Sequence, residues 1–87
     1  MNKTESRKAL NEVIFEMVTG LGYNIHDDGD GGRITFAKPN CQNYNDSIEY
    51  QRSRFDVCVL NDASDEVKED AKTIEWFINT QRKALNI

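Results

Sequence analysis

The chain of 87 residues is long enough for one small domain with a modest core, so we expect a single domain spanning residues 1–87. Its composition, 38% hydrophobic and 30% charged, excludes a disordered chain, and no apolar run approaches the roughly 20 residues of a membrane span. Fifteen acidic against eleven basic residues disfavour broad nucleic-acid binding and allow a basic protein partner.

Residues 4–18 predict an amphipathic helix, because apolar side chains recur at steps of three and four residues. Thr4 or Asn2 can cap its start, and Gly20 or Gly22 can supply the left-handed residue that ends it. Phe15 falls on a flank, where we expect it to pack beside the core. The stripe consists of Leu10, Val13, Ile14, Met17, Val18 and Leu21.

A β-hairpin is predicted next. Residues 23–26 form a short alternating strand, and residues 33–38 form the return strand, with Ile34 and Phe36 facing inward. Residues 27–32 between them hold Asp-Gly pairs and further glycines, which permit the positive φ of a tight turn. The polar residues 40–47 predict a loop.

The strongest strand signal lies at residues 54–60, where Phe55, Val57 and Val59 alternate onto one face. Ile48 and Tyr50 have the opposite parity, so the two segments cannot form one regular strand. Either a bulge or bend lies near residues 52–53, or Ile48 and Tyr50 belong to a separate short strand. The single bent strand is the favoured alternative, which gives a sheet of three strands.

A second amphipathic helix follows residues 61–65, with Asp62 or Ser64 as its cap and acidic residues in its first turns. Its core stripe is Val67, Ala71, Ile74, Ile78 and Leu85, with Phe77 beside it. The element order and short connections predict an α+β fold. This fold is a two-layer α-β-β-β-α domain, with an antiparallel three-stranded sheet and both helices packed on one face.

The sequence contains residue types that serve in catalytic and metal sites, but they do not have the spacing that such sites require. His26, the only histidine, precedes an acidic turn, but the sequence places no nucleophile beside it. A calcium loop beginning in that turn would have Lys38 or Pro39 at its twelfth position, where a glutamate is needed. We therefore expect no enzymatic activity, no metal site and no cofactor.

The two cysteines, Cys41 and Cys58, lack a metal-binding spacing and are too few for a disulfide framework. Reduced thiols and an N-terminus without an apolar leader predict a cytoplasmic protein. Cys58 is most simply a small, partly buried residue. A single bridge between the two cysteines stays open.

Trp76 lies opposite the apolar stripe of the last helix, among charged residues. Either the loop of residues 40–47 covers it, which is the favoured alternative, or it anchors a partner. The acidic residues near the start of the helix, Asp62 included, are more numerous than is required to complement the helix dipole. The predicted partner-binding site, for a protein with a basic surface, consists of Glu66, Glu69, Asp70 and Trp76.

Basic residues lie near the sheet and define an alternative site. Arg33, Lys38, Arg52 and Arg54 can line up on the outer face or the edge of the sheet, near two tyrosines, Tyr44 and Tyr50. Basic and aromatic residues interleaved on a sheet hold single-stranded nucleic acid in known proteins. The alternative nucleic-acid site consists of Arg33, Arg52 and Arg54.

The order of one helix, three strands and one helix resembles the double-stranded-RNA-binding domain and the HicA-type mRNA-cleaving toxins. Residues 21–23, followed by residues 31–40, resemble the toxins' segment of a glycine and then a strand. This chain has Arg33 and Ile34 where the toxins place their catalytic histidine, and acids where the RNA-binding domains place a lysine run. The resemblance implies the topology and argues against the activity.

The sequence favours a small acidic, non-enzymatic protein that binds or inhibits another macromolecule. Inhibitors carried by phages and mobile elements, such as anti-restriction and anti-CRISPR proteins, have similar size and charge. The alternatives are a nucleic-acid-binding regulator with a fold like that of the double-stranded-RNA-binding domain, and a HicA-like RNase without the usual histidine. The partner, the host and the oligomeric state stay open.

Overall fold

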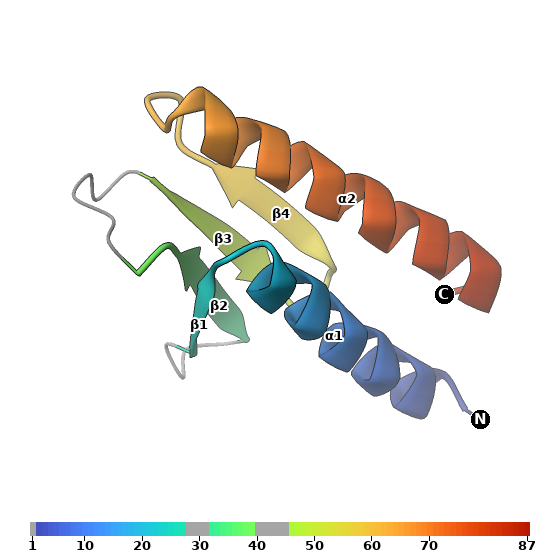
Figure 1. Ribbon diagram of the computed structural model, residues 1–87. Helices are drawn as coiled ribbons and strands as arrows, with labels where there is room; N and C mark the ends of the chain where they lie inside the picture. Colours follow the sequence, from blue (N-terminus) through green and yellow to red (C-terminus); the bar gives the residue numbers. More distant parts are fainter. Residues whose placement is uncertain (1, 28–31, 40–45) are drawn as a thin grey trace.

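The computed structural model describes residues 2–27, 32–39 and 46–87. Within them, one antiparallel sheet with strand order β1-β2-β3-β4 carries two helices, and Figure 1 shows both on the same side of the sheet. The α+β class and the placement of the helices agree with the prediction. The elements are α1 (Lys3–Gly20), β1 (Asn24–Asp27), β2 (Arg33–Ala37), β3 (Ser47–Gln51), β4 (Asp56–Val59) and α2 (Asp65–Leu85).

The sheet has four strands among the described residues, so the predicted three-stranded sheet is wrong, as is the single bent strand. β3 and β4 form a hairpin in which Ile48 lies opposite Val59 and Tyr50 opposite Val57. Opposite residues of an antiparallel pair share a face, so reversing the chain brings residues of even and odd parity onto the same side. The α-β-β-β-β-α order therefore differs from the layout on which the resemblance rested.

Phe55 was predicted as a strand residue but lies in the turn that joins β3 to β4. Its φ of 54° is left-handed, which is unusual for a bulky side chain. The ring is nevertheless buried, at 6% exposure, with the guanidinium carbons of Arg7 and Arg82 at 4.6 and 5.1 Å from its centroid. The turn thus connects both helices to the sheet.

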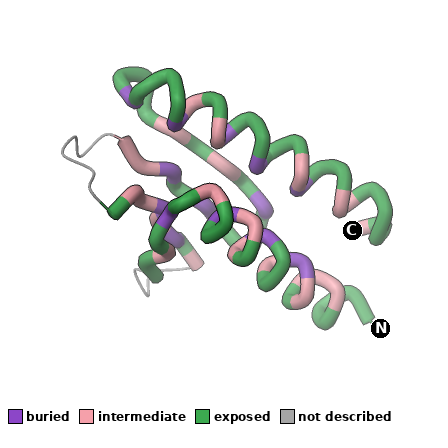
Figure 2. Tube along the Cα trace, in the orientation of Figure 1, coloured by how far each residue is buried: buried purple, intermediate pink, exposed green. Residues whose placement is uncertain are grey.

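The core lies between the helices and the inner face of the sheet, as the buried positions in Figure 2 show. Phe36 of β2 stacks on Tyr50 of β3 with ring centroids 5.6 Å apart, and Phe15 packs edge-on against both, as expected for a residue on the flank of α1. The buried helical residues of this core are Leu10, Ile14 and Val18 of α1 and Val67, Ala71, Ile74 and Ile78 of α2.

The ends of the helices agree in part with the predicted caps. Asn2 caps α1 by accepting a hydrogen bond from the Glu5 N–H at 2.8 Å, and Gly22 supplies a positive φ of 99° after the helix. Val13 and Leu85 were predicted in the core stripes, but each is 43% exposed. Val13 lies at the edge of its stripe, and the end of α2 runs past the sheet (Figure 1), so the sheet does not cover either residue.

Candidate functional site

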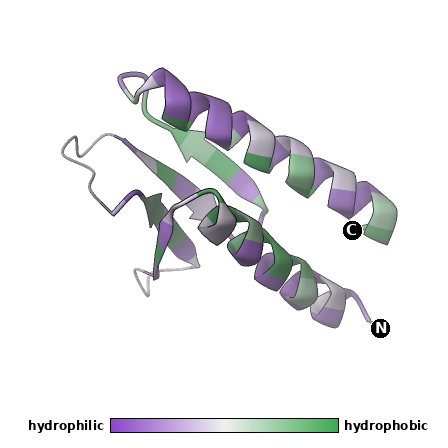
Figure 3. Cartoon of the chain, in the orientation of Figure 1, coloured by the Kyte–Doolittle hydropathy of each residue, from purple (hydrophilic) through white to green (hydrophobic). Residues whose placement is uncertain are grey.

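The sequence of α2 fixes which of its sides faces the core. Ser64 caps the helix by accepting a hydrogen bond from the Val67 N–H at 3.4 Å, and Asp65 and Glu66 occupy the first turn, where they complement the helix dipole. Because apolar residues recur at steps of three and four, one side is buried and the opposite side points away from the sheet. Figure 3 shows that this opposite side is largely hydrophilic.

Trp76 lies on that opposite side with 67% of its surface exposed. The favoured alternative, in which residues 40–47 cover the indole, falls mainly on residues 40–45, which lie outside the described part of the chain. We call the exposed side the outward face of α2. It consists of Asp65, Glu69, Lys72, Trp76 and Lys83.

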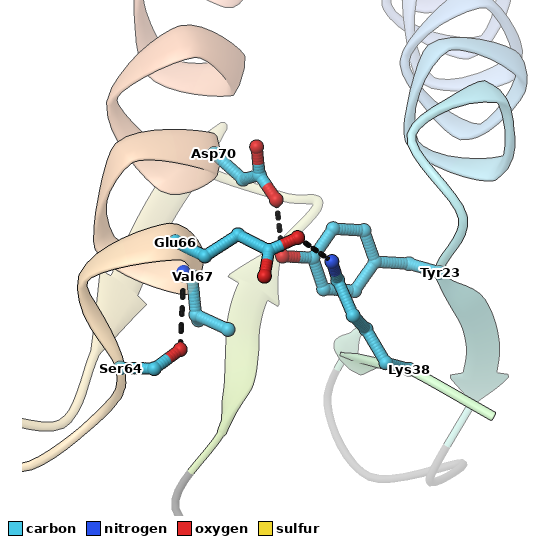
Figure 4. Close-up of polar contacts among 6 residues, drawn as sticks. All are labelled: Tyr23, Lys38, Ser64, Glu66, Val67 and Asp70. Carbon is cyan, nitrogen blue, oxygen red and sulfur yellow. Dashed lines mark hydrogen bonds and ion pairs between the residues drawn. The ribbon is translucent and has the colours of Figure 1, made fainter. Parts of the chain in front are cut away.

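The four residues predicted to bind a partner do not form one surface. Figure 4 shows Glu66 and Asp70 turned toward the rest of the domain, where Glu66 forms an ion pair with Lys38 and Asp70 accepts a hydrogen bond from the Tyr23 hydroxyl at 2.6 Å. Glu69 lies on the outward face with Trp76 and forms an ion pair with Lys72, at 3.5 Å across exposed side chains. Such an exposed pair contributes little, which leaves Glu69 available to a partner.

The contact at Tyr23 is a fixed part of the fold. The ring is only 2% exposed, and the Lys38 ammonium lies 5.3 Å from its centroid. Burial, reinforced by the hydrogen bond to Asp70, raises the pKa of Tyr23 above its usual range. The hydrogen bond to Glu66 likewise raises the pKa of Lys38. Asp70 therefore fastens α2 to Tyr23, just before β1, and Glu66 adds an ion pair to Lys38, just after β2.

The stability of the domain is expected to fall above about pH 10, the ordinary pKa of tyrosine. Burial also raises the pKa of Tyr50, so folding favours the neutral phenol at both Tyr23 and Tyr50. This contribution is complete below the unfolded pKa and is lost as pH rises through the folded values. Urea unfolding at a series of alkaline pH values measures it. The Tyr23→Phe/Tyr50→Phe variant should lose less stability over that range, and an equal loss would contradict the assignment.

The basic residues of the alternative site lie at one end of the sheet, and two of them have acidic neighbours. Arg52 lies 3.6 Å from Asp27, and Arg54 lies 3.9 Å from Asp56. Arg33 is exposed at the start of β2, opposite Gln51. Carboxylates this close oppose the approach of a phosphate. Lys38, which was expected to join this group, points instead toward α2.

Polar residues cross the outer face of the sheet in a row next to that of Arg33, Gln51 and Asp56, and this row consists of His26, Thr35, Glu49 and Cys58. His26 and Cys58 occupy opposite edge strands, three strand spacings or about 14 Å apart, so they cannot act as a pair. Cys58 is exposed, so its predicted partial burial is wrong.

No group of three or more metal-ligating side chains occurs among the described residues, while Cys41 and most of the acidic turn lie outside them.

Sequence reasoning missed the contacts that fix the orientation of α2. Besides Tyr23 and Lys38, Asp46 takes part by accepting a hydrogen bond from the Ser64 N–H at 2.6 Å. These contacts join residues far apart in the chain, and no local pattern signals them. Only the acidic start of α2 and the position of Trp76 opposite the stripe were visible in the sequence.

Neither helix in the described part of the chain has the length and apolar character needed to cross a membrane. No protein-family model matches the chain, and comparisons with curated proteins and with solved structures also find no match.

Proposed function

We propose that this protein is a non-enzymatic interaction module whose outward face of α2 binds a protein with a basic surface. The observation that carries the proposal is the exposure of Trp76, at 67%, on the side of α2 that faces away from the sheet. A large aromatic side chain on a preorganised helix offers contact area at low entropic cost, and tryptophan is enriched among the residues that dominate binding energy.

The charge of the surroundings supports a basic partner. Asp65 and Glu69 lie on the same side of α2 as Trp76, and the side chain of Glu66 remains 69% exposed despite its ion pair. The whole chain carries a formal net charge of −4. A basic partner would be steered toward this end of the helix, and the indole would supply the contact that holds it.

The proposal includes a role as an inhibitor, of the kind carried by phages and mobile elements. Its support is the small size, the acidic charge and an exposed anchor on a helix that is fastened on its inner side. Nucleic-acid binding through Arg33, Arg52 and Arg54 is the competing function. Its support is the position of the three arginines at one end of the sheet, and the acidic neighbours of Arg52 and Arg54 weaken it.

The expected effect of Trp76→Ala is a loss of about 2 kcal/mol of binding energy, or roughly thirtyfold in affinity, because the anchor is removed. Glu69→Lys should slow association several-fold, most strongly at low salt, because steering acts through exposed charges. Affinity capture from the native cell lysate identifies the partner, and surface plasmon resonance then measures both variants.

The matched control is Glu49→Lys, which makes the same change of charge on the outer face of the sheet. It should leave binding unchanged. Asp70 is unsuitable for charge reversal, because the buried Tyr23 hydroxyl depends on it. Unchanged affinity in Trp76→Ala, or loss of binding only after Arg33, Arg52 and Arg54 are replaced, would overturn the proposal.

A further inference from the structure

β4 lies at one edge of the sheet, with β3 as its only neighbouring strand in the described part of the chain. In an antiparallel sheet, alternate main-chain groups of an edge strand point away from its only neighbour and are free to pair with another strand. The other edge strand, β1, carries exposed His26 and Asp27 at its end. β4 carries half-buried Val57 and Val59 on its inner side, and its only charged residue is Asp56 at its start.

A groove runs between β4 and α2, on the side of the helix next to this edge. Val57, Val59 and Leu60 form its apolar part, and Leu60 is 49% exposed. Lys68, Ala71, Lys72 and Glu75 of α2 complete its lining. The groove is thus apolar next to the open main chain and charged along the helix.

We propose that a second copy of this chain pairs with β4, so that two sheets join into one of eight strands. A twofold axis perpendicular to the sheet places one residue opposite itself and keeps both inner faces on the same side. With Cys58 on the axis, Val57 lies opposite Val59 of the second copy and Asp56 lies opposite Leu60, just after β4. The two grooves then close on each other.

The charges on α2 are self-complementary under this axis. Lys68 and Glu75 lie on the same side of the helix, seven residues or about two turns apart. Because α2 runs back alongside β4 (Figure 1), Lys68 lies toward the Val59 end and Glu75 toward the Val57 end. The axis brings each Lys68 opposite Glu75 of the second copy. Lys72, which lies between them along the helix, pairs with Glu69 of its own helix.

A charge swap tests this arrangement directly. Lys68→Glu or Glu75→Lys alone should weaken the dimer about tenfold, because two attractive pairs become repulsive. A mixture of the two single variants should form heterodimers in preference to either homodimer. In the heterodimer one chain carries acids at both positions and the other carries lysines at both, so both cross-axis pairs become attractive again. Native mass spectrometry of the mixture, with one variant isotope-labelled, measures the proportions.

Cross-linking at Cys58 tests the position of the axis. Opposite Cα atoms in an antiparallel sheet lie about 4.5–5.5 Å apart, within the range of a disulfide. In a Cys41→Ser background, mild oxidation should convert the chain to a covalent dimer through Cys58. A control with Cys41→Ser, Cys58→Ser and His26→Cys places the single thiol on the β1 edge and should stay monomeric on a non-reducing gel.

The proposal fails if sedimentation finds the reduced wild-type chain monomeric across a concentration series. That result would leave the β4 edge to a strand from another protein. It also fails if random heterodimer proportions are found, or if Cys58 cross-links no faster than the thiol on β1. Binding of a basic partner is centred on Trp76, which does not line the groove, so a failed dimer test does not affect the proposed function.

Discussion

Replacing Ile74 with alanine should lower the free energy of unfolding by about 2–5 kcal/mol. Ile74 is fully buried, at 0% exposure, on the side of α2 that packs on the sheet. Truncation removes apolar contacts and leaves a cavity that the rigid sheet cannot fill by relaxing. In a domain of this size, such a loss is a large part of the total stability. Urea unfolding followed by circular dichroism measures the change.

Two matched variants make the Ile74 measurement specific. Val57→Ala should cost less, near the lower end of that range, because Val57 is only half-buried on the edge strand. Trp76→Ala, on the same helix as Ile74, should change stability by less than about 0.5 kcal/mol, because surface substitutions usually do. Equal losses for Ile74→Ala and Trp76→Ala would mean that the buried side of α2 has been assigned wrongly.

Phe55→Ala should destabilise the domain by about 3 kcal/mol. The substitution removes a buried ring from between Arg7 and Arg82, along with two cation–π contacts of about 0.5–1 kcal/mol each. Arg7, which lies against the ring, also holds the turn, because its Nη2 donates a hydrogen bond to the Ser53 carbonyl oxygen. Chemical denaturation gives the magnitude.

The left-handed conformation of Phe55 predicts an inverted order of alanine and glycine at this position. In a helix or strand, glycine is the less stable of the two. At a φ of 54° an L-residue bears a steric cost of about 1–2 kcal/mol that glycine avoids. Phe55→Gly should therefore be more stable than Phe55→Ala by about 1 kcal/mol. If alanine is the more stable replacement, the turn is not left-handed at residue 55.

The periodic elements of this fold were predictable from the sequence. The stripe through Leu10, Ile14 and Val18 predicts one buried side of a helix, and the alternation of Ile34 and Phe36 predicts one buried side of a strand. All of these residues are buried together in one core. One-sided helices and strands require two layers, so the α+β class and the shared face for both helices followed from local patterns alone.

The fourth strand was missed because its turn carries no recognisable signal. Residues 52–55 contain no glycine, proline or asparagine, and the left-handed position is occupied by Phe55. The parity break between Tyr50 and Val57 was visible, but a bend and a hairpin both produce it. The hairpin is favoured by contacts between residues far apart in the chain, because Phe55 is buried between Arg7 of α1 and Arg82 of α2.

The candidate site was predictable in composition but not in arrangement. Acidic residues at the start of α2 and Trp76 opposite its stripe can be read from helical periodicity. The sequence cannot show that Lys38 forms an ion pair with Glu66, or that the Tyr23 hydroxyl donates a hydrogen bond to Asp70, because the partners are distant along the chain. The structure thus divides the predicted set into two residues that fasten the helix and two, Glu69 and Trp76, that face outward.

The most direct test of the proposed interaction is photo-cross-linking from position 76. A photoreactive phenylalanine analogue is placed there in one protein and at Glu49, on the opposite side of the domain, in another. Both proteins are irradiated in the native cell lysate. We predict one discrete adduct with a basic protein from position 76, weakened by salt, and none from position 49. Adducts from position 49 alone, or adducts of position 76 with nucleic acid, would contradict the account.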